Sequence, residues 1–168
     1  WRQMMARKLG LNAFDPSTDE ALITELLAIL PLVETDMTIF FRRLASLDGE
    51  DFSPSAADDE ALMDPFMDAY YVPDQLTDAV RSRTANWLRR YLKRTCRDNT
   101  PFQIRRRRMN AVNPKYVLRN YMAQMAIDKA EQDDFSMIHE LLDLLRRPYD
   151  EQPEKEAFAA RRPDWARN

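Results

Sequence analysis

Residues 113–153, NPKYVLRNYMAQMAIDKAEQDDFSMIHELLDLLRRPYDEQP, decide the fold of this chain. Asn113 can accept a hydrogen bond from the first free N–H groups of a helix, and Pro114 suits the first helical position, where a missing N–H costs nothing. An apolar stripe at helical spacing follows, formed by Val117, Leu118, Tyr121, Met122 and Met125. These residues predict an amphipathic helix capped by Asn113.

A second helix is predicted directly after the pair Asp133-Asp134, which can cap its first turn. The pair Arg146-Arg147 suits its last turn, because cations interact favourably with the negative end of the helix dipole, and Pro148 ends it. The apolar stripe of this helix repeats at i, i+3, i+4 and i+7 through Ile138, Leu141, Leu142 and Leu145. The stretch therefore predicts a helical hairpin with Leu142 in the middle of a buried face.

The composition favours helices throughout. The 168 residues include only two glycines, Gly10 and Gly49, whereas average usage is roughly 7%. Leu, Ala, Arg, Met and Glu, which favour helices, are abundant, and no strand-like alternation bounded by turns stands out. We predict an all-α chain with a single domain over residues 1–168, folded as an irregular bundle of about seven to nine helices.

Caps and prolines outline the remaining helices. Gly10 ends the first, and Ser17 and Glu20 have the spacing of a capping box at the start of the second. Thr35 or Asp36 caps the third, whose inward face is predicted to be Met37, Phe40, Phe41, Leu44 and Leu47. An acidic loop is expected over 48–58. Further helices are expected at about 59–68, at 73–97 (the longest, opened by Pro73), at 101–110, and after Pro153 with Phe158.

Charge is divided between two adjacent blocks. Residues 48–78 contain ten acidic residues and no basic one, and residues 81–108 contain eleven basic residues against Asp98 alone. The run Arg105–Arg108 could bind phosphate groups, but four consecutive helical residues point around the helix and at most two share a face. We expect the blocks to face each other, and the arginine run to form ion pairs or to dock on a neighbouring domain rather than to bind nucleic acid.

Several short motifs have the wrong context for catalysis. Cys96-Arg97-Asp98-Asn99 lacks the later asparagine of a kinase catalytic loop, and Asp134-Phe135-Ser136 begins a helix with no strand before it. His139-Glu140 lacks the second histidine of a zinc-protease helix, and the acidic loop from Asp48 lacks the glycine that a calcium loop needs. Cys96 is predicted to be a buried structural thiol. The sequence thus predicts no catalytic, cofactor-binding or metal-binding residue in this chain.

The chain resembles the C-terminal part of the selenoprotein O family, over nearly its whole length apart from residues 48–70. That family consists of kinase-like proteins that transfer AMP from ATP onto protein hydroxyl groups. The resemblance implies that the nucleotide- and metal-binding residues lie upstream of Trp1, and that a redox-active cysteine or selenocysteine lies beyond the terminal Trp motif. The matching motifs are Lys8–Leu11 onwards to Phe41–Leu44, Met109-Asn110, Asn113–Tyr121, Leu145–Pro153 and Pro163-Asp164-Trp165.

The resemblance implies a function for the whole family protein rather than for this chain. Because the chain begins with Trp1 rather than Met, we expect an excised helical piece that is inactive alone and supports an upstream kinase-like core. ATP, Mg²⁺ or Mn²⁺ and protein substrates are implied for the whole protein, with no cofactor in this piece. The alternative is a free-standing helical module with its own protein partner. No membrane partner is expected, and the expected location is the bacterial cytoplasm, or mitochondria in a eukaryote.

Overall fold

A computed structural model of the chain describes residues 1–48 and 58–166, so most of the predicted acidic loop lies outside the described residues. Those residues form eight α-helices and four short 3₁₀ helices. Extended pairing among them is limited to one isolated bridge between Thr35 and Tyr70. The predicted all-α class and helix number are confirmed. No helix in the described part combines the length and apolar character needed to cross a membrane.

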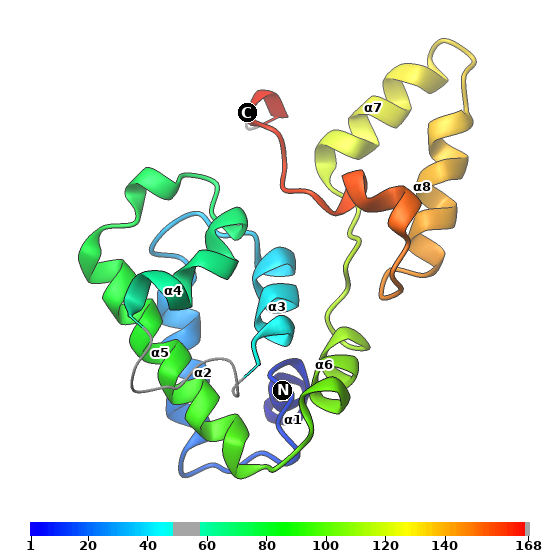
Figure 1. Cartoon of the computed structure of the whole chain (residues 1–168). Helices are drawn as coiled ribbons and strands as arrows, with labels where there is room; N and C mark the ends of the chain where they lie inside the picture. The colour runs from blue at the N-terminus through cyan, green and yellow to red at the C-terminus, as the bar shows by residue number, and fades with distance from the viewer. Residues whose placement is uncertain (49–57, 167–168) are drawn as a thin grey trace.

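The first part of the chain folds as a bundle around helix α5 (Figure 1). Helix α5 packs against α2 and α4, and α6 packs against α1 and α3. Trp87 and Tyr91 of α5 stack with ring centroids 5.4 Å apart in the core. Their polar atoms are satisfied by backbone carbonyls, since Trp87 donates to Leu22 at 2.8 Å and Tyr91 donates to Leu9 at 3.0 Å. The helices of this bundle are α1 (Arg2–Lys8), α2 (Asp19–Ile29), α3 (Met37–Ser46), α4 (Asp59–Met63), α5 (Asp78–Arg97) and α6 (Phe102–Asn110).

Local hydrogen bonds move two of the predicted helix starts. Helix α5 begins after Thr77, whose hydroxyl accepts from the Val80 N–H, whereas Pro73 opens a separate 3₁₀ turn, Pro73–Gln75. The predicted capping box at Ser17 does not form, because Ser17 and Thr18 donate instead to the Asp15 carboxylate.

At helix α3 the predicted cap is confirmed, since the Asp36 carboxylate accepts from the Ile39 N–H at 3.1 Å. The predicted inward face is confirmed at Phe40, Phe41, Leu44 and Leu47. It is wrong at Met37, which is 49% exposed. Met37 is the first residue of the helix and precedes the turn that packs on the core.

The predicted hairpin is confirmed as helices α7 (Asn120–Ala130) and α8 (Ser136–Arg146), but Asn113 does not cap it. The Asn113 side chain is buried and donates to the Lys8 carbonyl at 2.9 Å, so it anchors the connection between the bundle and the hairpin to α1. Lys115 and Tyr116 then donate their N–H groups to the Pro148 carbonyl. Residues 113–119 are therefore an extended connection, and α7 starts six residues later than predicted.

The buried face of α8 is also shifted by one residue from the predicted stripe. Met137, Leu141 and Leu144 are buried against Met122 and Ala126 of α7. Ile138 and Leu142, which the prediction placed inside, are 42% and 49% exposed. Both sets repeat at i, i+4 and about i+7, so the sequence offers two adjacent apolar faces and α7 covers only one of them.

Figure 1 shows the hairpin beside the bundle, joined to it by the connection 111–119 and by the C-terminal segment that returns toward the bundle. The buried residues form two separate hydrophobic clusters, one in each part. Polar groups make the joint between them. Arg119 forms an ion pair with the buried Asp36, whose carboxylate also accepts from the Tyr71 hydroxyl at 2.9 Å. Arg162 pairs with Glu34 at 2.7 Å.

Candidate functional site

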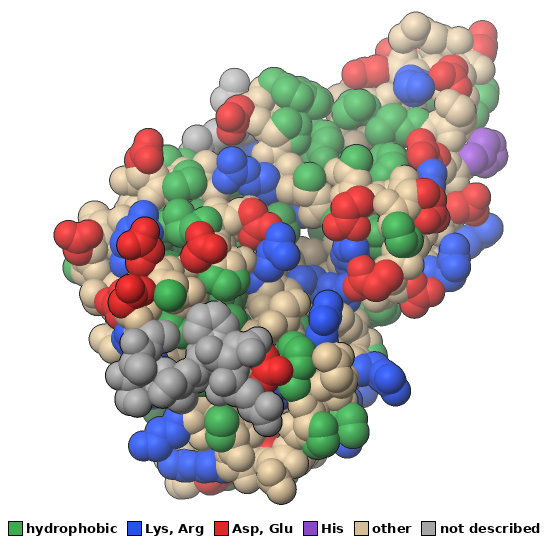
Figure 2. Space-filling view, viewed as in Figure 1, with side chains coloured by type: hydrophobic (Ala, Val, Ile, Leu, Met, Phe, Trp, Pro, Cys, Tyr) green, Lys and Arg blue, Asp and Glu red, His purple; other side chains and the backbone are tan. Residues whose placement is uncertain are grey.

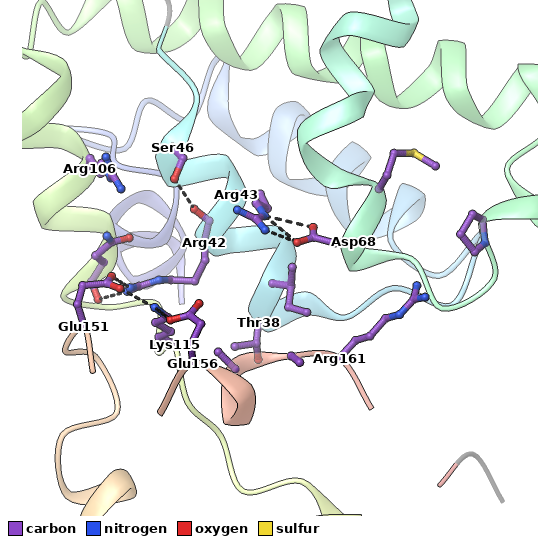
Figure 3. A pocket seen from close by; sticks show the side chains of 16 residues that line it. Thr38, Arg42, Arg43, Ser46, Asp68, Arg106, Lys115, Glu151, Glu156 and Arg161 are labelled. Atoms are coloured by element: carbon purple, nitrogen blue, oxygen red, sulfur yellow. Dashed lines mark hydrogen bonds and ion pairs between the residues drawn. The ribbon is translucent and has the colours of Figure 1, made fainter. Parts of the chain in front are cut away.

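A groove of about 640 Å³ lies between helix α3 and the 3₁₀ helix η3 (Pro153–Ala159). Ile39, Arg42, Arg43 and Ser46 of α3 form one wall (Figure 3). Residues 151–161 form the opposite wall, and α6 and the connection to the hairpin contribute at one end. The groove thus lies where the two parts of the molecule meet, and segments far apart in the sequence build it.

Arg42 holds this junction together. Its side chain is only 13% exposed and pairs with Glu151. The same guanidinium donates to the carbonyls of Asn113 at 3.3 Å and Tyr149 at 3.4 Å. Burial lowers the pKa of Arg42, and the neighbouring Glu151 carboxylate partly opposes that shift. Arg42 therefore serves as a cross-link between α3, the connection and the segment after α8.

Lys115 makes a second cross-link in the same wall. Its ammonium group lies 2.6 Å from Glu151 and 2.5 Å from Glu156. Burial alone would lower the pKa of Lys115, but these two hydrogen bonds outweigh it and raise the pKa. Burial alone would raise the pKa of Glu151, but the hydrogen bond from Lys115 and the charges of Arg42, Lys115 and Arg106 together outweigh it and lower the pKa. Both groups are consequently held in their charged forms.

Three further cations line the groove. Arg43 forms a forked ion pair with Asp68 across the gap between α3 and the neighbouring 3₁₀ helix η1 (Asp64–Ala69). Arg161 donates to the Tyr70 carbonyl. Arg106 is exposed and forms no ion pair or side-chain hydrogen bond with any residue in the described part of the chain. The lining has five cations and three carboxylates, so the groove carries a positive excess.

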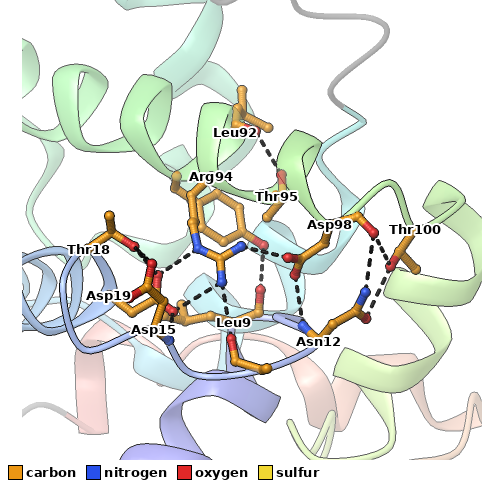
Figure 4. Close-up of polar contacts among 12 residues, drawn as sticks. Leu9, Asn12, Asp15, Thr18, Asp19, Leu92, Arg94, Thr95, Asp98 and Thr100 are labelled. Atoms are coloured by element: carbon orange, nitrogen blue, oxygen red, sulfur yellow. Dashed lines mark hydrogen bonds and ion pairs between the residues drawn. The ribbon is translucent and has the colours of Figure 1, made fainter.

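A second, smaller hollow of about 310 Å³ lies beside Arg94 on α5. Arg94 donates to Asp19 at 2.7 Å and to Asp98 at 2.7 Å, and it reaches the Ala13 carbonyl at 3.1 Å (Figure 4). The hydrogen bond to Asp19 is the main cause of its raised pKa. Asp19 begins α2, Ala13 lies in the loop before it, and Asp98 follows the last residue of α5, so the network ties the start of α2 and the preceding loop to the end of α5.

The four arginines of the run Arg105–Arg108 have different surroundings. Arg105 is buried and donates to the Tyr91 hydroxyl at 2.9 Å and to the Leu47 carbonyl. Arg108 donates to Asn12 at 2.8 Å. Arg106 faces the groove, and Arg107 is exposed. The helical geometry thus spreads the four charges around α6, as the spacing predicts.

The two charge blocks meet only in part within the described residues. Asp59 pairs with Arg89 at 2.7 Å and accepts from Ser82 at 2.7 Å, which joins the blocks at one point. Elsewhere the partners lie outside the opposite block: Arg83 pairs with Glu25. Figure 2 shows acidic and basic side chains interspersed over the visible face rather than gathered into one basic patch.

Among the motif residues, the prediction made for Cys96 is wrong. It is exposed rather than buried. Four residues along a helix turn roughly 40° past a full circle, so the face that runs through Leu88 and Leu92 drifts away from position 96. The buried face ends at Thr95 instead.

The other motif residues lie near the surface. Asp98 pairs with Arg94, and the Asp134 carboxylate accepts from the Ser136 N–H at 3.0 Å at the start of α8. His139 is exposed on α8. The described residues contain no group of three or more His, Cys, Asp or Glu that could hold a metal ion. Sequence reasoning missed the groove, because its walls come from segments that only folding brings together.

The chain is similar to proteins of one family along its length. The family model described as protein adenylyltransferase SelO matches residues 1–146. A protein nucleotidyltransferase YdiU of Rhodopirellula baltica is 48% identical over 172 residues, which cover 100% of this chain and 32% of the relative. The protein of the same name from Aromatoleum aromaticum is 53% identical over 167 residues, which cover 99% of this chain and 30% of the relative. The chain therefore spans about a third of the length of these curated relatives.

Proposed function

Because the chain belongs to the SelO family of protein adenylyltransferases, we propose that it is the C-terminal helical region of such a protein, and that it supports catalysis without carrying it out. The observation that supports this proposal most is the extent of the similarity, which covers the whole chain but only about a third of each relative. The activity in the relatives' name, nucleotidyl transfer to protein, is on this proposal a property of the longer polypeptide.

AMP transfer from ATP needs donors that cradle the phosphates and carboxylates that hold Mg²⁺ or Mn²⁺. On this proposal the groups that do so lie in the longer polypeptide. Gly10 has φ +69° and closes α1, and a Cβ there would lie 2.8 Å from side-chain atoms of Arg105 and Met109. This glycine therefore serves the packing of α1 on α6 and is not available for a phosphate loop.

The proposed partner is the remainder of the family protein, a kinase-like core. The exposed face of α8 supports this, because Phe135, Ile138 and Leu142 are 51%, 42% and 49% exposed along one side of the helix. Their spacing of three and four residues forms a continuous apolar stripe. Such a stripe suits contact with another protein surface.

Labelled ATP provides the test. The purified chain and a full-length relative are each incubated with it, with Mg²⁺ or Mn²⁺ and an acceptor protein, and transfer onto the acceptor is measured. We expect transfer by the full-length relative and none above a heat-denatured control by the chain alone. Label transfer by the chain alone would contradict the proposed division between core and support.

A further inference from the structure

In the groove between α3 and η3, some of the cationic side chains form ion pairs and others do not. Arg42, Arg43 and Lys115 each have a carboxylate partner. Arg106 and Arg161 form no ion pair within the described part of the chain, and Arg106 acts on the Glu151 carboxylate only through its charge. These two side chains lie on opposite sides of the groove in Figure 3. An elongated ligand with negative charge toward each end would match this arrangement.

The remaining lining residues indicate the chemistry of the ligand between its two charged ends. Side chains of Ile39, Met67, Pro73, Ala159 and Ala160 supply apolar surface, and Thr38 and Ser46 add hydroxyl groups. None of the lining residues is aromatic, so nothing in the described lining offers a ring on which a nucleotide base could stack. An apolar surface with scattered hydrogen-bonding groups suits a short stretch of polypeptide better than a nucleotide.

We propose that this groove binds an extended acidic peptide segment. One carboxylate of the peptide pairs with Arg106 and another with Arg161, while its apolar side chains lie along Ile39 and Met67. The volume of about 640 Å³ is within the range of ordinary ligand pockets, roughly 300–1,000 Å³. The existing ion pairs hold the walls in place beforehand, which reduces the entropy lost on binding. This inference concerns binding alone and is independent of the proposed support of adenylyl transfer.

Neighbouring arginines give a matched test. A fluorescein-labelled peptide with glutamate near each end and leucine and alanine between is titrated with the chain, and fluorescence polarisation is followed. Arg106→Ala removes a cation from the groove, whereas Arg107→Ala removes a cation that is also exposed but lies outside the lining of the groove. Because Arg106 is exposed and its ion pair with the peptide is partly screened by water, we expect Arg106→Ala to weaken binding about two- to fivefold. Arg107→Ala is expected to leave the dissociation constant unchanged.

Three controls separate this proposal from bulk electrostatics. The same peptide with glutamine in place of glutamate is expected to bind at least about tenfold more weakly. Inorganic phosphate at matched ionic strength is expected not to displace the labelled peptide, and a single-stranded oligonucleotide is expected not to bind with comparable affinity. The proposal is overturned if the wild-type chain does not bind the glutamate peptide, if both arginine variants lose binding equally, or if any of these three controls fails.

Discussion

Asp19 is a buried carboxylate that joins the start of α2 to the end of α5. It has no exposed surface, and it accepts from Arg94 at 2.7 and 3.1 Å and from the Asp15 N–H at 2.8 Å. Removing one member of a buried ion pair leaves the other charge without compensation, which costs more than the pair itself contributes. The neighbouring Glu20 pairs with Arg2, but both of these side chains are about half exposed.

We therefore expect Asp19→Ala to lower the free energy of unfolding by about 3–5 kcal/mol. Glu20→Ala, which removes a solvated pair one position away, is expected to cost at most ~1 kcal/mol. Urea denaturation of the two variants measures both values. Equal losses would show that burial does not set the strength of these pairs.

At the scale of the helical element, the hairpin shows that a sequence can predict where helices form but not which of their faces is buried. Periodicity predicts two helices there, and α7 and α8 are present. Periodicity cannot choose between two adjacent apolar faces of α8, because Met137, Leu141 and Leu144 have the same kind of spacing as Ile138 and Leu142. The choice depends on where α7 lies. The groove was beyond prediction for the same reason, since Arg42 and Glu151 are 109 positions apart.

Adjacent leucines of α8 test that assignment. Leu141 is 5% exposed and Leu142 is 49% exposed. We expect Leu141→Ala to lower the free energy of unfolding by ~2–5 kcal/mol, because it opens a cavity against α7. Leu142→Ala is expected to cost less than about 1 kcal/mol, as a surface substitution does. Chemical denaturation decides between them, and a larger loss at Leu142 would restore the stripe predicted from the sequence.

The residues from Glu151 to Glu156, which lead into η3, are held by ion pairs whose strength depends on pH. The pKa of Glu151 is lowered from its usual 4.5 in the folded chain. Its contribution to stability is therefore fully present above 4.5 and is lost as the pH falls through the lower folded pKa. The raised pKa of Lys115 works in the opposite direction: its contribution is present below the usual 10.5 and is lost as the pH rises through the folded pKa.

We expect Glu151→Gln to reduce the fall in melting temperature that the wild-type chain shows below about pH 4.5. Glu154→Gln is the control, since Glu154 is exposed in the same segment and has no ion-pair partner in the described part. Thermal melts at neutral and acid pH provide the measurement. Identical pH profiles for wild type and Glu151→Gln would show that this carboxylate does not stabilise the junction.

At the scale of the whole molecule, the two hydrophobic clusters are linked by charge rather than by shared apolar packing. Arg119 is the central contact of this link. Its side chain is 12% exposed and one of its nitrogens pairs with Asp36, yet its Nε and second Nη have no hydrogen-bond partner. Unsatisfied buried donors each cost about 1–3 kcal/mol, so we expect the joint to be weaker than either part that it connects.

Local opening should therefore be easier in the hairpin than in the bundle, because its cluster is smaller and its attachment is polar. We expect amide hydrogens of α7 and α8 to exchange faster than those of α5 around Trp87 and Tyr91. Arg119→Ala is expected to accelerate exchange across α7 and α8 and to leave α5 unchanged. Arg146→Ala is the control, since its pair with Asp143 is 68% and 74% exposed and lies away from the joint. Hydrogen exchange followed by mass spectrometry makes the comparison. If Arg119→Ala accelerated exchange equally in α5 and in the hairpin, the two clusters would unfold as one unit, and the joint would be part of a continuous core.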